Sequence, residues 1–116
     1  MNRIAVLFFI LAGSFAAMAQ AELSTKSKKA IELYTMADNY RVRRQFNEAI
    51  SLLNEAIEKD KNFVEAYHRL GLTYFAMNQY KKAIANFEKG LSLTTDLRKQ
   101  KIFLQLLSIY IHRYTR

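Results

Sequence analysis

The side chains best suited to chemistry in this sequence are two histidines, His68 and His112. Catalysis or metal binding would require an acidic side chain that orients the ring, or further ligands beside it. We expect neither histidine to have such a neighbour and place both on the surface or in a groove. The sequence also lacks cysteine, a glycine-rich phosphate loop and a nucleophile-elbow serine. We therefore predict a protein that is not an enzyme and that binds no metal and no cofactor.

Basic residues are in excess, with 18 Lys and Arg against 10 Asp and Glu, so that the formal net charge is +8 at pH 7. They gather within 41–44, at 81–82 and within 99–101, but acidic residues such as Glu48 and Glu65 are dispersed among them. A nucleic-acid interface would need a continuous basic stripe. We expect no nucleic-acid partner and assign most of these charges to solvated helix faces, with weak binding to anionic envelope polymers or lipid head groups as an alternative.

Helices are the elements that must position these side chains. Proline is absent and the three glycines lie at 13, 71 and 90, so the sequence has too few turn-forming residues for a protein built of short strands. The sequence also repeats itself at an offset of 34, because residues 30–63 align with residues 64–97. In this alignment Tyr40 meets Tyr74 and Ala49 meets Ala83. A fixed period of this length predicts stacked, similar units.

Within each repeat the apolar residues recur at i, i+3, i+4 and i+7, the spacing of an amphipathic helix. We predict four short helices in two antiparallel hairpins, because the turns at 43–45 and 77–79 are too short for another arrangement. The four apolar stripes consist of Leu33, Met36, Ala37 and Tyr40; Phe46, Ala49, Ile50, Leu53 and Ile57; Tyr67, Leu70, Gly71 and Tyr74; and Tyr80, Ala83, Ile84, Phe87 and Leu91.

Gly71 and Gly90 fall inside predicted helices, where glycine costs about 1 kcal/mol relative to alanine. They align with Ala37 and Ala56 of the first repeat. We interpret these four small residues as the places where one helix presses closely on the next. For Gly90, a cap at the helix end is the alternative.

Polar side chains mark the ends of the predicted helices. Residues 60–62 and 94–96 contain Asp, Asn and Thr side chains that can cap the helices that follow them. Ser24 or Thr25 is expected to cap a helix that begins at Lys26.

The second repeat resembles the tetratricopeptide repeat family, and the first repeat fits the same pattern more loosely. The prolines usual in the family are replaced by Lys61 and Thr95. The resemblance implies an all-α solenoid of antiparallel helical hairpins, with a lead-in at 20–29, repeats at 30–63 and 64–97, and a C-terminal half-repeat or capping helix at 98–116. The residues of the second repeat that carry the resemblance are Tyr67, Leu70-Gly71, Tyr74, Tyr80, Ala83, Phe87 and Gly90.

In this family the first helices of the hairpins line a concave groove, so the resemblance implies a module that holds a peptide or protein partner. One groove chemistry of the family, a two-carboxylate clamp for chaperone C-termini, needs lysine and asparagine where Tyr34 and Asp38 stand. This departure argues against such a ligand. The residues expected to face the groove are Tyr34, Thr35, Asp38, Arg41, His68, Arg69, Leu72, Phe75, Phe103 and Leu106.

The first 19 residues predict export from the cytoplasm. Arg3 supplies a positive start, an apolar run covers 4–12, and Ala17-Met18-Ala19 is a small-x-small cleavage site. The apolar run is about half of the ~20 residues that a spanning helix requires. We predict a signal peptide at 1–19, with an uncleaved anchor as the alternative, and a location in the periplasm or cell envelope of a Gram-negative bacterium.

The C-terminal segment from residue 96 to residue 116 has an unusually wide apolar surface for the last helix of a solenoid, which normally shows a polar outer face. Its spare surface is expected to meet a partner or a second copy of the chain. Alternatively, the protein is a shortened form similar to exported tetratricopeptide envelope proteins that carry an OmpA-like peptidoglycan-binding domain. The apolar residues of this segment are Ile102, Phe103, Leu104, Leu106, Leu107, Ile109, Tyr110, Ile111 and Tyr114.

Overall fold

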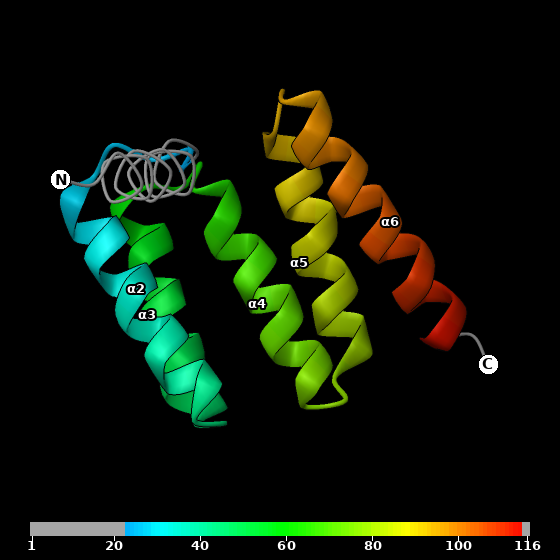
Figure 1. Ribbon diagram of the computed structural model, residues 1–116, viewed down its shortest axis with the longest axis horizontal. Helices are drawn as coiled ribbons and strands as arrows, with labels where there is room; N and C mark the ends of the chain where they lie inside the picture. The colour runs from blue at the N-terminus through cyan, green and yellow to red at the C-terminus, as the bar shows by residue number, and fades with distance from the viewer. Residues whose placement is uncertain (1–22, 115–116) are drawn as a thin grey trace, which may run out of the picture.

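The computed structural model describes residues 23–114, which form five helices and no strand. They are α2 (Lys28–Val42), α3 (Phe46–Lys59), α4 (Val64–Ala76), α5 (Tyr80–Leu93) and α6 (Leu97–Tyr114) (Figure 1). The predicted all-α solenoid is confirmed. Within this described range no helix is both long and apolar enough to cross a membrane. The predicted signal peptide at 1–19 lies outside the described residues.

The helices form two hairpins followed by a single helix. α2 packs on α3 and α4 packs on α5, while α3 against α4 joins the two hairpins and α6 packs on α5 (Figure 1). The short turns between the members of each hairpin leave the chain no room for anything but an antiparallel return. The first helix of each hairpin therefore recurs on one side of the stack, with α6 continuing that series.

The two hairpin turns are built in the same way, 34 residues apart. Arg44 and Asn78 both adopt the left-handed backbone conformation, with φ values of 60° and 61°. In each turn a backbone N–H reaches back over the helix end, from Gln45 to the Tyr40 carbonyl and from Gln79 to the Tyr74 carbonyl, both at 2.9 Å. This bond satisfies a carbonyl that the helix end would otherwise leave open.

The core consists of two apolar clusters that meet at α4. The first lies between the first hairpin and one face of α4, and the second lies between α4, α5 and α6. Phe63 and Phe87 are fully buried and are the largest side chains at the two centres. The buried members of the first cluster are Ala30, Leu33, Ala37, Leu53, Ala56, Phe63, Ala66 and Leu70, and those of the second are Val64, Ala83, Phe87, Phe103, Leu107 and Tyr110.

Both helical glycines stand under aromatic rings. A Cβ atom on Gly71 would lie 2.4 Å from the nearest ring atom of Phe87, and one on Gly90 would lie 2.6 Å from the ring of Phe103. The close-approach interpretation is therefore confirmed for both positions. The alternative cap at Gly90 is wrong, because α5 continues to Leu93.

The helix caps differ in part from the predicted ones. Ser27 caps α2, which begins at Lys28, since its side chain accepts a hydrogen bond from the Ala30 N–H at 3.2 Å. Asp60 accepts the Asn62 N–H at 3.0 Å and so shapes the turn before α4. Asp96 caps α6 as predicted, because its carboxylate accepts the Arg98 N–H at 2.8 Å.

Ser24 caps a helix that is distant in the sequence. Its hydroxyl accepts the Val64 N–H of α4 at 2.9 Å and donates to Glu65 at 2.6 Å, and its backbone N–H also donates to the Glu65 carboxylate. The predicted cap on a helix at Lys26 is wrong because α2 begins two residues later, at Lys28, and is capped by Ser27. Ser24 instead fastens the segment before α2 to the start of α4.

Replacing Ser24 with alanine is expected to lower the free energy of unfolding by about 1–2 kcal/mol, because the first N–H of α4 loses its cap and Glu65 loses a donor. Urea denaturation followed by circular dichroism measures this loss. Ser51→Ala is the matched control, because Ser51 is exposed on α3. Equal stability of both variants would show that the Ser24 contacts contribute nothing.

Candidate partner-binding groove

Four of the predicted groove residues meet on the side of the stack formed by α2 and α4. The Asp38 carboxylate receives the Arg41 Nε at 3.2 Å from its own helix and the Arg69 Nε at 3.0 Å from α4. The guanidinium of Arg69 also lies over the ring of Tyr34, 5.5 Å from its centroid. This polar cluster of Tyr34, Asp38, Arg41 and Arg69 is partly open to solvent, since the three charged side chains are between 26% and 31% exposed.

The polar cluster carries a surplus of positive charge, because two guanidinium groups share one carboxylate. Burial raises the pKa of the Tyr34 hydroxyl above its ordinary value, although the charge of Arg69 opposes this shift. The phenol is therefore a neutral hydrogen-bond donor at physiological pH. Such a site suits a carboxylate, to which arginine donates charge-assisted hydrogen bonds.

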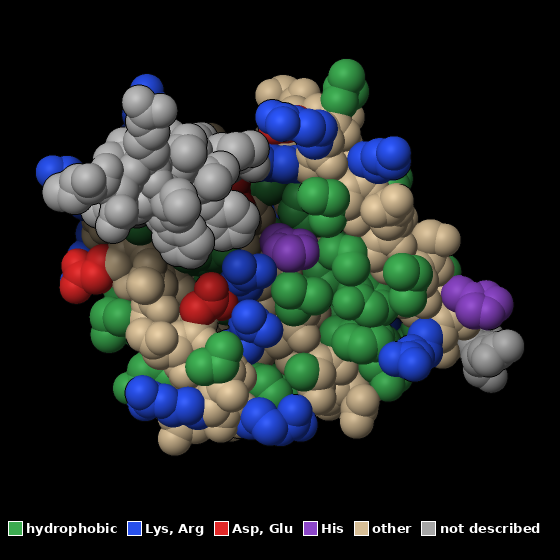
Figure 2. All heavy atoms as spheres, in the orientation of Figure 1, with side chains coloured by type: hydrophobic (Ala, Val, Ile, Leu, Met, Phe, Trp, Pro, Cys, Tyr) green, Lys and Arg blue, Asp and Glu red, His purple; other side chains and the backbone are tan. Residues whose placement is uncertain are grey.

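An apolar strip continues from the polar cluster across α4 and α6. Leu72 and Phe75 of α4 and Leu106 of α6 are partly buried, while Ile102 and Ile109 of α6 are 49% and 58% exposed. The last three follow one another at i, i+4 and i+7 and so share one face of α6. Figure 2 shows hydrophobic side chains gathered over the half of the molecule formed by α4, α5 and α6, with Lys and Arg side chains along the border.

Phe75 joins this strip to the core. Its ring stacks on Tyr110 with the centroids 3.9 Å apart, lies 5.2 Å from the ring of Tyr80, and is covered by the Arg113 guanidinium at 5.6 Å. The ring therefore holds α6 against α4 and α5 as well as lining the surface. Replacing it would disturb the packing of α6, so Phe75 is a poor position at which to test binding alone.

Phe103 belongs to the core rather than to the exposed surface. It is 3% exposed, its ring lies over Gly90, and its edge meets the ring of His68 at 5.7 Å. The family resemblance placed it in the groove, but the resemblance could not show how α6 is rotated about its own axis. The neighbour that offers exposed apolar surface in its place is Ile102.

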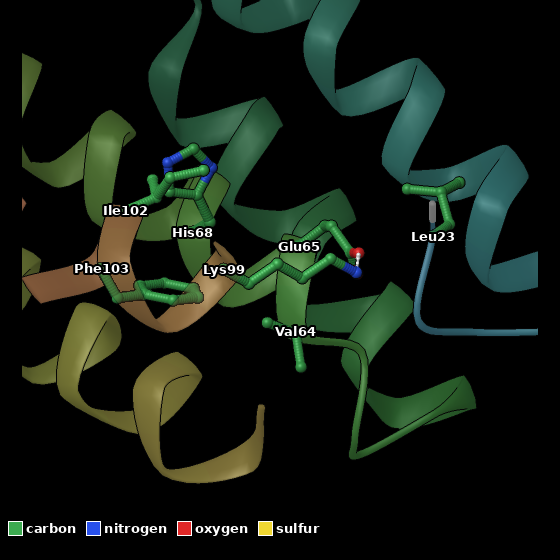
Figure 3. A pocket seen from close by; sticks show the side chains of 7 residues that line it. All are labelled: Leu23, Val64, Glu65, His68, Lys99, Ile102 and Phe103. Carbon is green, nitrogen blue, oxygen red and sulfur yellow. Dashed lines mark hydrogen bonds and ion pairs between the residues drawn. The ribbon is translucent and has the colours of Figure 1, made fainter. Parts of the chain in front are cut away.

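A pocket of about 210 Å³ opens between α4, α6 and the segment that leads into α2. An ion pair crosses it, between the Lys99 Nζ and the Glu65 Oε1 at 2.7 Å, and Leu23 lies on the other side of this pair from His68 and Phe103 (Figure 3). Glu65 and Lys99 are 16% and 22% exposed, so the pair is largely shielded from solvent. The residues that line the pocket are Leu23, Val64, Glu65, His68, Lys99, Ile102 and Phe103.

Glu65 is the centre of this junction. Burial alone would raise the pKa of its carboxyl, but the hydrogen bonds from Lys99 and Ser24 outweigh burial and hold the pKa below the usual range. The carboxylate therefore stays ionised and fastens α6 and the N-terminal segment to α4. The expectation that no acid lies beside His68 is wrong, because Glu65 precedes it by three residues and lines the same pocket. That carboxylate is used by Lys99 and Ser24.

Burial lowers the pKa of His68 to about 4, and the nearby charges of Arg69 and Arg41 act in the same direction. The ring lies between the aromatic rings of Phe87, at 6.1 Å, and Phe103. A neutral imidazole at pH 7 adds apolar area to the strip and no charge. His68 thus joins the polar and the apolar parts of the groove as an uncharged side chain near neutral pH.

The stability of the protein is expected to fall by about 2 kcal/mol between pH 7.5 and pH 5.0 because of His68. The unfolded chain binds a proton on this ring as the pH falls through about 6.5, whereas the folded protein does so only near 4. The stabilisation is therefore complete above 6.5 and is lost progressively on acidification. Urea denaturation at the two pH values should show this loss in the natural sequence and a much smaller one in His68→Gln. An equal loss in both proteins would assign the effect to other groups.

Nine of the ten predicted groove residues thus divide into three sets, and Thr35 lies outside them. Tyr34, Asp38, Arg41 and Arg69 form the polar cluster; His68, Leu72, Phe75 and Leu106 form the strip; and Phe103 is in the core. Thr35 is exposed and donates its hydroxyl to the Ile31 carbonyl at 2.9 Å. Five residues that line the pocket were not among the predicted groove residues, and of these only Glu65 could have been found, from its helical spacing to His68. These five are Leu23, Val64, Glu65, Lys99 and Ile102.

Within residues 23–114, no three His, Cys, Asp or Glu side chains lie close enough together to hold a metal ion. The polar cluster and the apolar strip offer arginine, phenol and apolar side chains, which are the groups that most often anchor protein interfaces.

Comparison with known families gave two matches. A tetratricopeptide repeat model matches residues 64–93, and a second model, described as a TPR repeat, matches residues 37–78. The comparison with curated proteins gave no significant match.

Several solved structures share the fold. A tetratricopeptide repeat domain protein from Salinibacter ruber superposes with a TM-score of 0.66 at 17% identity, over 74% of this chain and 90% of the other. A protein from Bordetella parapertussis gives a TM-score of 0.67 at 20% identity, over 97% and 91% of the two chains. The first TPR domain of Spaghetti (RPAP3), bound to the HSP90 peptide SRMEEVD, gives 0.65 at 16% identity, over 77% and 71%.

Proposed function

Because this chain carries tetratricopeptide repeats, we propose that it is a non-catalytic interaction module whose groove binds an extended segment of a protein or peptide. The observation that carries this proposal is the position of the polar cluster beside the apolar strip on the first helices of the hairpins. Arg69 belongs to the first, and His68 and Leu72 of the same helix belong to the second. A peptide that crosses α4 would meet both chemistries within one helical turn.

The chemistry of the groove favours a ligand with one acidic side chain followed by apolar ones. Arg41 and Arg69 can offer further N–H donors to a ligand carboxylate, since each is shown bonding to Asp38 through Nε. The structural neighbour bound to an HSP90 peptide supports a peptide as the type of ligand. Tyr34 and Asp38 remain incompatible with the two-carboxylate clamp, so the proposed ligand is held by an internal acidic residue rather than by its C-terminus.

Arg69→Ala is expected to weaken peptide binding about tenfold, since truncation of a central charged anchor costs on the order of 1.4 kcal/mol or more. A library of 12-residue peptides is selected on the natural protein, and the affinities of the selected peptides are measured by calorimetry. Arg43→Ala is the matched control, because it removes the same charge from an exposed turn. Equal losses for both variants, or failure to select any peptide, would contradict a groove centred on Arg69.

We also propose that the protein is exported and acts in the cell envelope of a Gram-negative bacterium. The proposal is supported by the pattern of residues 1–19, with its positive start, short apolar run and small-x-small site. Expression of the full sequence in a Gram-negative host, followed by fractionation and intact-mass measurement, tests it. The expected product lies in the periplasmic fraction and begins at Gln20. A product that stays in the cytoplasm with residues 1–19 attached would refute export.

A further inference from the structure

The last helix repeats the design of α4 more closely than the sequence period suggests. The buried residues of α6 fall on those of α4 when the offset is 37, which is three residues, or about one helical turn, longer than the repeat of 34. In both helices this face packs back on the preceding hairpin, in one case on α3 and in the other on α5. The matching buried pairs are Ala66 and Phe103, Leu70 and Leu107, and Thr73 and Tyr110.

The same register identifies the counterpart of the glycine in α4. Gly71 lies on the side of α4 that α5 covers, and it receives the buried ring of Phe87. Thirty-seven residues further on stands Ser108, another small residue, and it is exposed. The small, exposed side chain of Ser108 therefore leaves room on α6 for a large side chain from a neighbouring helix.

Large apolar residues flank this site, as they do in α4. Tyr67 and Tyr74, four before and three after Gly71, are partly buried. Their counterparts in α6 are Leu104 and Ile111, which are 56% and 42% exposed. The surface made by Leu104, Ser108 and Ile111, here named the α6 docking face, thus corresponds to the half of a hairpin interface that is contributed by its first helix.

The charges around the α6 docking face indicate which kind of helix could cover it. α6 contains four basic residues and no acidic residue. Lys99 pairs with Glu65 and Arg113 lies over Phe75, so the basic residue next to the docking face is Lys101. Lys101 precedes Leu104 by three residues and therefore borders the docking face. In the first hairpin the helix that covers α2 is α3, whose charged residues are three glutamates and one lysine. A second α6 would bring like charges together, whereas an acidic helix would complement them.

We propose that the α6 docking face binds an amphipathic helix of a partner protein, which completes a third hairpin as α5 completes the second. This helix places a large apolar side chain over Ser108, carries further apolar residues at helical spacing, and has an acidic solvent face. The proposal concerns a surface separate from the groove, because Ile102, Leu106 and Ile109 occupy a different face of α6.

The chain itself supplies two matched probes for this surface, because both of its second helices have the required apolar pattern. A peptide of residues 45–60 contains four acidic residues and one basic residue, and a peptide of residues 79–94 contains one acidic and three basic residues. Added to the protein at low salt, the acidic peptide is expected to bind with a Kd on the order of 100 μM and to gain helicity. The basic peptide is expected to bind at least tenfold more weakly, and 0.5 M salt should reduce this difference.

Two variants locate the binding. Leu104→Ser is expected to weaken binding of the acidic peptide at least tenfold. The control is Ile109→Ser, which changes a residue of similar exposure on the groove side of the same helix and should leave the affinity for this peptide unchanged. Arg69→Ala should also leave it unchanged, so failure here is distinguishable from failure of the groove proposal. No binding of the acidic peptide, or binding that Leu104→Ser does not weaken, would overturn the proposal.

Sedimentation of the protein without peptide tests the competing occupant. The proposal predicts that the protein without substitutions is a monomer at protein concentrations up to the Kd of the acidic peptide. A dimer that Leu104→Ser dissociates would assign the face to a second copy of the chain and would overturn the choice of a partner helix.

Discussion

Phe87→Ala is expected to lower the free energy of unfolding by about 3–5 kcal/mol, the largest loss predicted for any single truncation discussed for this protein. Phe87 is fully buried, lies over Gly71, and stacks on Tyr110 with 5.1 Å between the ring centroids. Its removal leaves a cavity at the point where α4, α5 and α6 meet. Because a small domain has only about 5–15 kcal/mol of total stability, a substantial unfolded population is expected at 37 °C.

Urea denaturation followed by far-ultraviolet circular dichroism measures this loss, and Phe46→Ala provides the comparison. Phe46 opens α3, is only partly buried, and has the Arg44 guanidinium 5.2 Å above its ring. Its truncation should lower the free energy of unfolding by on the order of 1 kcal/mol, because the Phe46 side chain buries less apolar area in the folded protein than Phe87 does. Similar losses for the two variants would show that Phe87 is not the centre of the second cluster.

Gly71→Val is expected to destabilise the protein by about 3 kcal/mol, even though valine is a better helix former than glycine. The new Cβ atom would lie 2.4 Å from the Phe87 ring, which has no exposed space into which to move. Ala85→Val on the exposed side of α5 is the control and should cost only a few tenths of a kcal/mol. Thermal and urea denaturation of both variants measure the two costs.

A smaller side chain at position 87 tests whether the contact between residue 71 and the Phe87 ring causes this loss. Gly71→Ala adds the same Cβ atom, and combining it with Phe87→Leu should be less harmful than the sum of the two single changes by about 1 kcal/mol or more. Strictly additive losses would mean that the contact between the glycine and the ring does not limit stability.

The hairpins could be predicted from the sequence because the information is local. The apolar spacing depends on neighbours within a few helical turns. The repeat of 34 residues, which places the small residues Gly71 and Gly90 in register with Ala37 and Ala56, is visible when two stretches of the sequence are compared. The structure confirms the all-α fold and the close approach at both glycines. It differs at the ends of the helices, where Ser24 caps α4 across 40 residues of sequence, a contact that no local pattern contains.

The groove was predictable only in part. The resemblance placed Tyr34, Asp38, Arg41 and Arg69 on two first helices, and the structure shows that they form one cluster. It could not show that one carboxylate serves both arginines, because the sharing depends on the distance between α2 and α4. The rotation of α6 was equally inaccessible, since an apolar helix with residues on several sides can dock by more than one face, and the choice of Phe103 for the core depends on the space above Gly90.

The sequence by itself determined that this protein is a stack of helical hairpins, because helical periodicity is a property of residues close together in the chain and the repeat can be read from the sequence alone. Only the tertiary structure decided which surfaces remain for partners. The histidine at 68 illustrates the difference: its type suggested chemistry, but burial between two aromatic rings and two nearby arginines keeps it neutral. Burial and charge depend on segments that are distant in the sequence, and these meet only when the chain has folded.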